Sequence, residues 1–305
     1  MKNEKNFNDQ IKEKDFLVTA EYLPKADLNE AAVQSVVQFL KEVPSAVNVA
    51  DNPFGVAMSS LAASCFLSQS GIEPIYQIVT RDRNRIAIQS DLLGAASLGI
   101  KNMLCISGYH QTLTDSNESA NVYDIDSTQM IQMIKKMRDK NELLNGAKIG
   151  NSFSIITGAA ANPFLKPIDL NMIRLSQKIE SGASFIQTHA VFDVNEFKLW
   201  MDTAVNAGLA DKTAVLAGVL PLESADEAEY LNKKYTEFEI PVNVIDRLKK
   251  AGDKTAQKKE GIAICLETIE SLKKIKGVRG IHIFSGGKEE FLPEILNASG
   301  LSGKK

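Results

Sequence analysis

The sequence has few cysteines and histidines, no long apolar run and no excess of either charge. Its 305 residues include three cysteines, Cys65, Cys105 and Cys265, and none of them belongs to a C-x-x-C pair. This spacing excludes a disulfide framework and the usual ligand sets of zinc and iron–sulfur sites. We therefore expect the cysteines to be small buried residues of helices or strands.

The histidines give no metal-binding pattern either. His110, His189 and His282 lie far apart, and neither H-x-x-x-H nor H-E-x-x-H occurs, so we expect no metal site. A G-x-S-x-G motif is missing, and so is a lysine in the middle of a strand candidate. These absences argue against an α/β-hydrolase and against a Schiff-base aldolase.

Charge and hydropathy exclude two classes of partner. Lys and Arg total 35 and Asp and Glu total 38, which gives a net charge of −3 with no dense basic block. We expect no nucleic-acid partner, because phosphate contacts need concentrated positive charge. The longest apolar run, residues 214–222, is far shorter than the ~20 residues that cross a bilayer. The polar N-terminus lacks the apolar segment of a signal peptide, so we expect a cytoplasmic protein without a membrane partner.

Short apolar, β-branched runs alternate with longer amphipathic stretches along the whole chain. Ile168, Met172, Leu175 and Ile179, for example, have the spacing of three and four that gives a helix one apolar face. Alternation of this kind is typical of βα units around a parallel sheet. The strand candidates are residues 16–23, 46–51, 74–80, 102–107, 150–157, 184–192, 214–220 and 280–285.

Eight strand candidates, each followed by a helix candidate, predict the α/β class and a (β/α)8 TIM barrel. No G-x-G-x-x-G follows a strand, which argues against an open dinucleotide-binding sheet. We expect one domain over residues 1–305, with an N-terminal extension (1–15) and a short C-terminal tail (299–305). Residues 108–124 form a long polar insertion and residues 223–276 hold more than one helix; such insertions usually cover an active site.

In a barrel the working groups lie where the strands end, and Glu21 is the conspicuous one. It lies within the apolar run FLVTAEYL, so burial should raise its pKa toward that of a proton donor at neutral pH. The alternative is a structural Glu paired with Arg or Lys across the barrel mouth. Strand-end positions also make Arg81, Asp82, Asn162, Gln187 and Thr188 candidate cofactor or substrate contacts.

Residues 81–85, RDRNR, form a charge cluster between a strand candidate and a helix candidate. Such a cluster can hold an anionic group. It can equally be a solvated rim with internal ion pairs. No P-loop pattern accompanies it, so any phosphate would depend on arginine and on amides at a helix N-terminus.

Six segments together resemble the methylenetetrahydrofolate reductase family, especially its short single-barrel type from anaerobic bacteria. The resemblance covers about residues 15–298, and its longest and most specific segment is PIYQIVTRDRNRIAIQSDLLGAASLGIKNMLCISG at 74–108. The other segments are VTAEYLPK (18–25), VNVADNP (47–53), GAAANP (158–163), KIESGASFIQTHAVFD (178–193) and LAGVLPL (216–222).

The resemblance implies a flavoprotein of one-carbon metabolism and methionine biosynthesis, which reduces 5,10-methylenetetrahydrofolate to 5-methyltetrahydrofolate. Hydride would come from N5 of the reduced flavin, FAD or alternatively FMN, and Glu21 would be the general acid that helps to open the five-membered ring. Together with the strand-end candidates, it places the flavin against Ala50, Gln77, Arg81, Asp82, Ser107, Gly108, Tyr109, Ala159, Ala160, Asn162 and Lys178. It places the substrate against Glu21, Gln187, Thr188 and His189.

Four positions depart from the family's usual residues. Gln77 replaces His, Ala50 replaces Thr, His189 replaces Gln and Tyr109 replaces Asp. These departures keep two alternatives open. One is a flavin- and folate-binding partner subunit of a larger complex, without reductase activity of its own. The other is a diverged barrel enzyme that acts on a different one-carbon donor.

The resemblance also leaves the source of electrons open. NAD(P)H is one donor. Short family members in anaerobes often work beside a partner subunit that carries zinc and iron–sulfur clusters, and such a subunit is the other donor. Barrel enzymes frequently associate through their outer helices, so a homo-oligomer is a further expectation.

Overall fold

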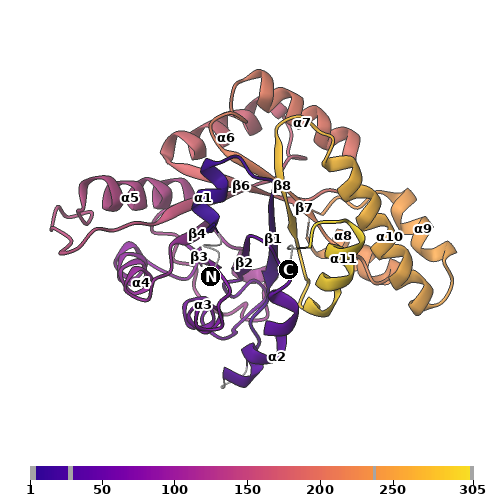
Figure 1. The fold of residues 1–305 in the computed structure, drawn as a ribbon, viewed down its shortest axis with the longest axis horizontal. Helices are drawn as coiled ribbons and strands as arrows, with labels where there is room; N and C mark the ends of the chain where they lie inside the picture. The colour runs from indigo at the N-terminus through magenta and orange to yellow at the C-terminus, as the bar shows by residue number, and fades with distance from the viewer. Residues whose placement is uncertain (1–4, 27–29, 236–237, 303–305) are drawn as a thin grey trace.

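A computed structural model of the chain, described for residues 5–26, 30–235 and 238–302, contains a closed barrel of parallel strands (Figure 1). The strands follow one another around the barrel in sequence order, and β1 pairs with β8 to close it. The prediction of a (β/α)8 barrel is therefore confirmed. The strands are β1 Leu17–Tyr22, β2 Ala46–Val49, β3 Pro74–Val79, β4 Asn102–Ile106, β5 Ile156–Ala161, β6 Ala183–Ala190, β7 Ala214–Val219 and β8 Val278–Ile283.

Helices surround the barrel and connect successive strands (Figure 1). Strands β3 and β7 are buried at every position, because one face lies in the barrel interior and the other under the helices. The α-helices are α1 Phe7–Lys12, α2 Glu30–Leu40, α3 Ser60–Gln69, α4 Arg85–Ser97, α5 Ser127–Lys140, α6 Ile168–Ser181, α7 Val194–Asn206, α8 Ala225–Lys234, α9 Val242–Lys250, α10 Lys254–Leu272 and α11 Leu292–Ala298; two 3₁₀ helices are η1 Gln111–Leu113 and η2 Glu289–Phe291.

The N-terminal segment closes the bottom of the barrel. Phe7 of α1 is fully buried and meets the ring of Phe185 edge to face, at a centroid distance of 5.2 Å. It packs with side chains near the starts of the strands, including Leu17 and Ala214. Arg279 of β8 holds the segment by donating to the carbonyls of Ile11 and Asp15. Residues 1–4 of the expected extension and 303–305 of the expected tail lie outside the described residues.

The fifth strand is displaced from its expected position. It runs over Ile156–Ala161, whereas the sequence pattern placed it at residues 150–157. The prediction followed apolar β-branched residues, and the alanines that form the strand have low strand propensity. Packing decides the outcome: a Cβ on Gly158 would lie 2.3 Å from the Phe185 ring, so only a residue without a side chain fits there.

The two expected insertions follow the carboxyl ends of β4 and β7. Residues 108–124 form a loop that contains η1, and residues 223–276 contain α8, α9 and α10, as expected. In the described ranges, no helix is long and apolar enough to cross a membrane. The described side chains also include no group of three or more His, Cys, Asp or Glu residues that could hold a metal ion.

Candidate active site

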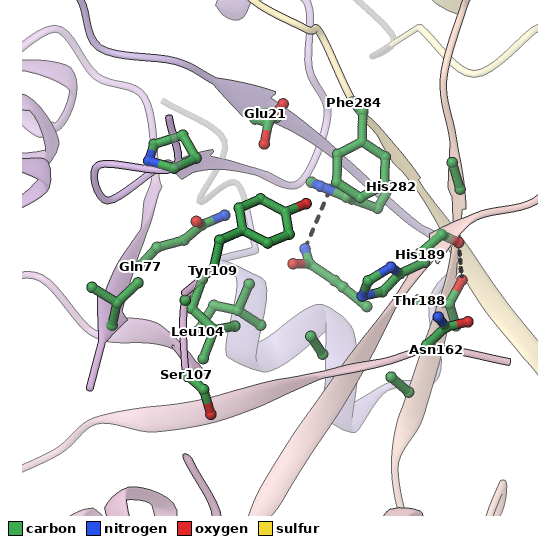
Figure 2. A pocket seen from close by; sticks show the side chains of 18 of the residues that line it. Glu21, Gln77, Leu104, Ser107, Tyr109, Asn162, Thr188, His189, His282 and Phe284 are labelled. Atoms are coloured by element: carbon green, nitrogen blue, oxygen red, sulfur yellow. Dashed lines mark hydrogen bonds between the residues drawn. The ribbon is translucent and has the colours of Figure 1, made fainter. Parts of the chain in front are cut away.

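A cavity of about 500 Å³ opens at the carboxyl ends of the strands. This volume lies in the range of pockets for small molecules and cofactors. Figure 2 shows Glu21 and Tyr109 directed toward the same space from opposite walls. Its lining is Glu21, Asp51, Pro53, Gln77, Val79, Arg81, Leu104, Ile106, Ser107, Gly108, Tyr109, Ala160, Ala161, Asn162, Leu165, Lys178, Gln187, Thr188, His189, Ala190, Phe238, His282 and Phe284.

Glu21 is the acidic group of this cavity. It is the one partly exposed residue of β1, because its side chain reaches the barrel mouth while its neighbours are buried. Burial raises its pKa to about 7, and the charge of Glu289 adds to the rise; hydrogen bonds from the backbone of Gly286 and Ser285 oppose it. A carboxyl group with this pKa holds a proton in a large fraction of molecules at neutral pH.

A layer of polar side chains lies in the barrel interior at the cavity floor. The amide nitrogen of Gln187 donates to Thr19 Oγ1 at 3.1 Å and to Asn48 Oδ1 at 3.0 Å, and its oxygen accepts from Asn48 at 2.6 Å. Both amide hydrogens of Gln187 are therefore used within the barrel. Gln187 thus supports the floor of the cavity, which it also lines, and its contact with a substrate stays a prediction.

The same network contacts Nδ1 of the His282 ring and bears on which ring nitrogen carries the hydrogen. Because Thr19 accepts from Gln187, its own hydroxyl hydrogen is free to donate to His282 Nδ1, 2.9 Å away. The amide nitrogen of Gln187 lies 3.4 Å from the same Nδ1. Two donors beside Nδ1 favour the tautomer in which Nδ1 accepts and Nε2 carries the hydrogen. Burial lowers the pKa of His282 to about 3, so the ring is neutral at physiological pH. His282 lines the cavity and can thus present a neutral N–H donor there.

Arg81 organises the loops on the opposite side of the mouth. Its guanidinium is 2% exposed and binds both carboxylate oxygens of Asp82. It also donates to the carbonyls of Asn52 and Tyr109, at 2.9 and 3.0 Å. Arg81 therefore joins the loops after β2, β3 and β4, and most of its donors have protein partners.

Arg83 makes a second buried ion pair close to the cavity. It donates to the fully buried carboxylate of Asp51 at 2.6 Å and to Asp91 at 3.0 Å. Asp51 also accepts hydrogen bonds from the backbone N–H of Val79 and from the side-chain amide of Asn52. The three arginines of the charge cluster at 81–85 are thus all paired with carboxylates: Arg81 with Asp82, Arg83 with Asp51, and the exposed Arg85 with Asp124. The internal ion pairs expected for this cluster are present, and it is not an open anion site.

Lys178 reaches the cavity from α6. Its ammonium group donates to the carbonyl of Ala160 at 2.7 Å, and burial lowers its pKa. Ala160 and Ala161 form the adjacent wall with side chains of one carbon each. A cation over a wall of small residues can bind a flat anionic ring without steric hindrance.

Most of the candidate residues named from the sequence line this single cavity. Three do not: Ala50 and Ala159 are buried, and Asp82 is bound to Arg81. Thr188 lines the cavity, but its hydroxyl donates to the carbonyl of His189 and accepts from Gly218.

The apolar lining of the cavity was not among the residues predicted from the sequence, and it includes Pro53, Val79, Leu104, Ile106, Ala161, Leu165, Ala190, Phe238 and Phe284. Leu104 and Ile106 alternate along β4, and this spacing marks them as side chains of one strand face. Phe238 comes from the segment between α8 and α9, within the insertion of residues 223–276 that was expected to cover an active site. The sequence pattern did not indicate which residue of this insertion lines the cavity.

Comparison with known proteins identifies sequence relatives. The model of the family described as Methylenetetrahydrofolate reductase matches residues 6–300. A protein of Caenorhabditis elegans named "Probable methylenetetrahydrofolate reductase (NADPH)" is 23% identical over 81% of this chain. The chain spans 35% of that relative's length. The "5,10-methylenetetrahydrofolate reductase" of Pectobacterium carotovorum is 19% identical over 76% of the chain and 72% of its own length.

Among solved structures, a protein from Clostridium thermocellum has a TM-score of 0.69. It covers 97% of this chain and 98% of its own, with 13% sequence identity, and its description says that it binds two copies of 5-methyl-5,6,7,8-tetrahydrofolic acid. At this identity the likeness is one of fold.

Proposed function

Because the chain belongs to the methylenetetrahydrofolate reductase family, we propose that it reduces 5,10-methylenetetrahydrofolate to 5-methyltetrahydrofolate with a bound flavin. The observation that carries the proposal is Glu21, a carboxyl group with a pKa of about 7 that faces a cavity large enough for flat ring ligands. The Clostridium thermocellum protein of the same fold, described as binding 5-methyltetrahydrofolic acid, supports folate as the ligand class.

The chemistry of the cavity fits a flavin. One wall consists of small and aliphatic side chains, Ala160, Ala161, Leu104 and Ile106, against which a planar ring can lie. Lys178, whose ammonium group donates to the carbonyl of Ala160, can neutralise negative charge on a reduced ring. The residues proposed to hold the flavin are Gln77, Ser107, Gly108, Tyr109, Ala160, Asn162 and Lys178.

A flavin bound here would supply hydride to the methylene carbon of the folate. The chain supplies the proton and the orientation. Glu21 donates its proton to the folate nitrogen that leaves the methylene carbon, which favours the open iminium form over the closed ring. Apolar side chains, Phe238 among them, line the cavity that this carboxyl group faces, and burial of the carboxyl group raises its pKa. His282 and His189 are donors for the polar edges of the substrate.

Cofactor identity and electron donor are parts of the same proposal. We take FAD as the flavin and NADPH as the first electron donor to test, since NADPH stands in the name of the Caenorhabditis elegans relative. The alternative donor is a partner subunit. Reduction of the purified flavoprotein by NADPH alone distinguishes the two.

The test is a spectroscopic half-reaction. We expect the purified protein to be yellow, to bleach with dithionite and to recover its colour on addition of methylenetetrahydrofolate. Glu21→Gln should lose folate-dependent recovery by at least about a hundredfold, the usual scale for removal of a general acid, while it keeps its flavin. Protein that cannot be reconstituted with FAD or FMN would contradict the proposal. Flavin binding without folate-dependent recovery would favour a binding subunit or another one-carbon donor.

A further inference from the structure

A second acidic side chain lies behind Glu21, outside the cavity lining. Glu289, in η2 directly after β8, is 3% exposed. Its Oε1 accepts a hydrogen bond from the backbone N–H of Leu23 and one from the hydroxyl of Ser285, both at 3.2 Å. Leu23 lies two residues after Glu21, so these bonds join the end of β1 to the turn after β8.

Each of the two carboxyl groups accepts hydrogen bonds from the segment that carries the other. Glu21 of β1 accepts from backbone groups of Ser285 and Gly286, which follow β8. Glu289, which follows β8, accepts from Leu23 after β1. The strand pair that closes the barrel therefore brings two buried acids together, and Glu289 raises the pKa of Glu21 through its charge.

The ion pairs found in the described ranges leave this pair without a cation. Lys288, next to Glu289 in sequence, instead donates to Glu223 and Glu227 at 2.6 and 2.8 Å. Lys258 of α10 lies 3.6 Å from Glu223 and over the ring of Phe291. Other charged or titratable groups on neighbouring elements, within the described ranges, include Asp51, which is paired with Arg83, the neutral His282, and the exposed Glu30, Glu290 and Glu294.

Hydrogen bonding indicates which carboxyl group keeps the proton. Burial raises the pKa of Glu289, but three groups favour its charged form: its own N–H, the N–H of Leu23 and the Ser285 hydroxyl. Glu21 has two such bonds, and it also faces the charge of Glu289. When two close carboxyl groups cannot both ionise, the less well solvated one holds the proton. That group is Glu21.

We propose that Glu289 is a positioning residue, which acts from behind the cavity wall to keep a proton on Glu21 before the substrate arrives. The inference rests on the proposed function, because it explains why Glu21, the proposed general acid, carries a proton. Glu289 itself does not touch the substrate. Its effect should therefore appear in a pH profile.

The experiment compares the pH dependence of folate-driven reoxidation in the dithionite-reduced holoprotein. In Glu289→Gln we expect the alkaline limb to move about one pH unit toward acid, with about tenfold slower reoxidation above the midpoint. Glu290→Gln is the matched control, because it removes a carboxylate from the same turn at an exposed position. It should leave the midpoint unchanged, and Glu289→Asp, which restores the charge, should return the midpoint close to that of the wild type.

An unchanged midpoint in Glu289→Gln, or an equal shift in Glu290→Gln, overturns the inference. Infrared titration of the protonated carboxyl band, identified by its loss in Glu21→Gln, gives a readout without turnover. We expect Glu289→Gln to lower the midpoint of this band by the same amount. If methylenetetrahydrofolate does not reoxidise the reduced wild-type protein, the proposed function is wrong. The midpoint of the infrared band in Glu289→Gln still tests whether Glu289 keeps a proton on Glu21. If Glu289→Gln does not fold, absence of the band in the wild type at pH 6 overturns the inference.

Discussion

At the scale of the residue, the site depends on where buried polar groups find partners. Arg81 and Gln187 are candidate ligand contacts in the sequence, and both line the cavity, where other groups of the protein already accept their hydrogen bonds. Glu21 and His282 differ, since burial raises the pKa of Glu21 to about 7, which leaves a large fraction of it protonated at neutral pH, and lowers the pKa of His282 to about 3, which keeps its ring neutral. Glu21 can therefore offer a ligand an acidic proton, and His282 can offer it a neutral hydrogen-bond donor.

Tyr109 gives a prediction for the flavin potential. Its ring lines the cavity and packs against Tyr235, with centroids 5.0 Å apart. A carboxylate at this position would repel the negative charge of a reduced flavin. We expect Tyr109→Asp to lower the two-electron potential by about 20 mV, which corresponds to an interaction of about 1 kcal/mol.

A redox titration of the bound flavin measures this shift. Tyr109→Asn is the control, because it loses the same aromatic contact without adding charge. The prediction is wrong if the Asp variant has a potential equal to or above that of the Asn variant.

At the scale of the element, two segments have functions that their local sequence does not indicate. β5 is built from alanines because Phe185 fills the space beside Gly158. The short helix α1 is mostly polar, yet one residue, Phe7, fills the bottom of the barrel. In both cases a partner far away in the sequence determines the packing.

Phe7 should therefore contribute strongly to stability. We expect Phe7→Ala to lower the free energy of unfolding by about 3–5 kcal/mol, the range for removal of a buried aromatic side chain. Phe16→Ala is a matched control, since Phe16 is 40% exposed and lies just before β1. Urea unfolding measures both variants, and an equal loss in the two would show that α1 is not part of the core.

At the scale of the whole molecule, closure of the barrel by β1 and β8 creates the acid site at a cost in stability. The folded-state pKa of Glu21, about 7, lies above its ordinary value of 4.5. Between these two values the folded protein binds more protons at this site than the unfolded chain does, so the contribution of Glu21 to stability falls as pH rises. His282 acts in the opposite direction: its lowered pKa reduces stability as the pH falls from about 6.5 toward 3.

The difference between wild type and Glu21→Gln isolates the first effect, because His282 is common to both proteins. We expect the variant to gain stability over the wild type as pH rises from 4.5 to 8, by up to about 3 kcal/mol. Urea unfolding at both pH values measures this gain. A difference that does not change with pH would contradict the raised pKa of Glu21.

The sequence by itself determined the fold class, seven of the eight strand positions, the two insertions and Glu21 as the candidate acid. These features depend on local periodicity and on the cost of burying charge in an apolar strand, and both are present in a short stretch of sequence. Only the tertiary structure decided that β5 begins at Ile156, that Gln187 supports the floor and that Glu289 stands behind Glu21. Each of these depends on residues more than twenty positions apart, which meet only because the closed barrel brings its strand ends together.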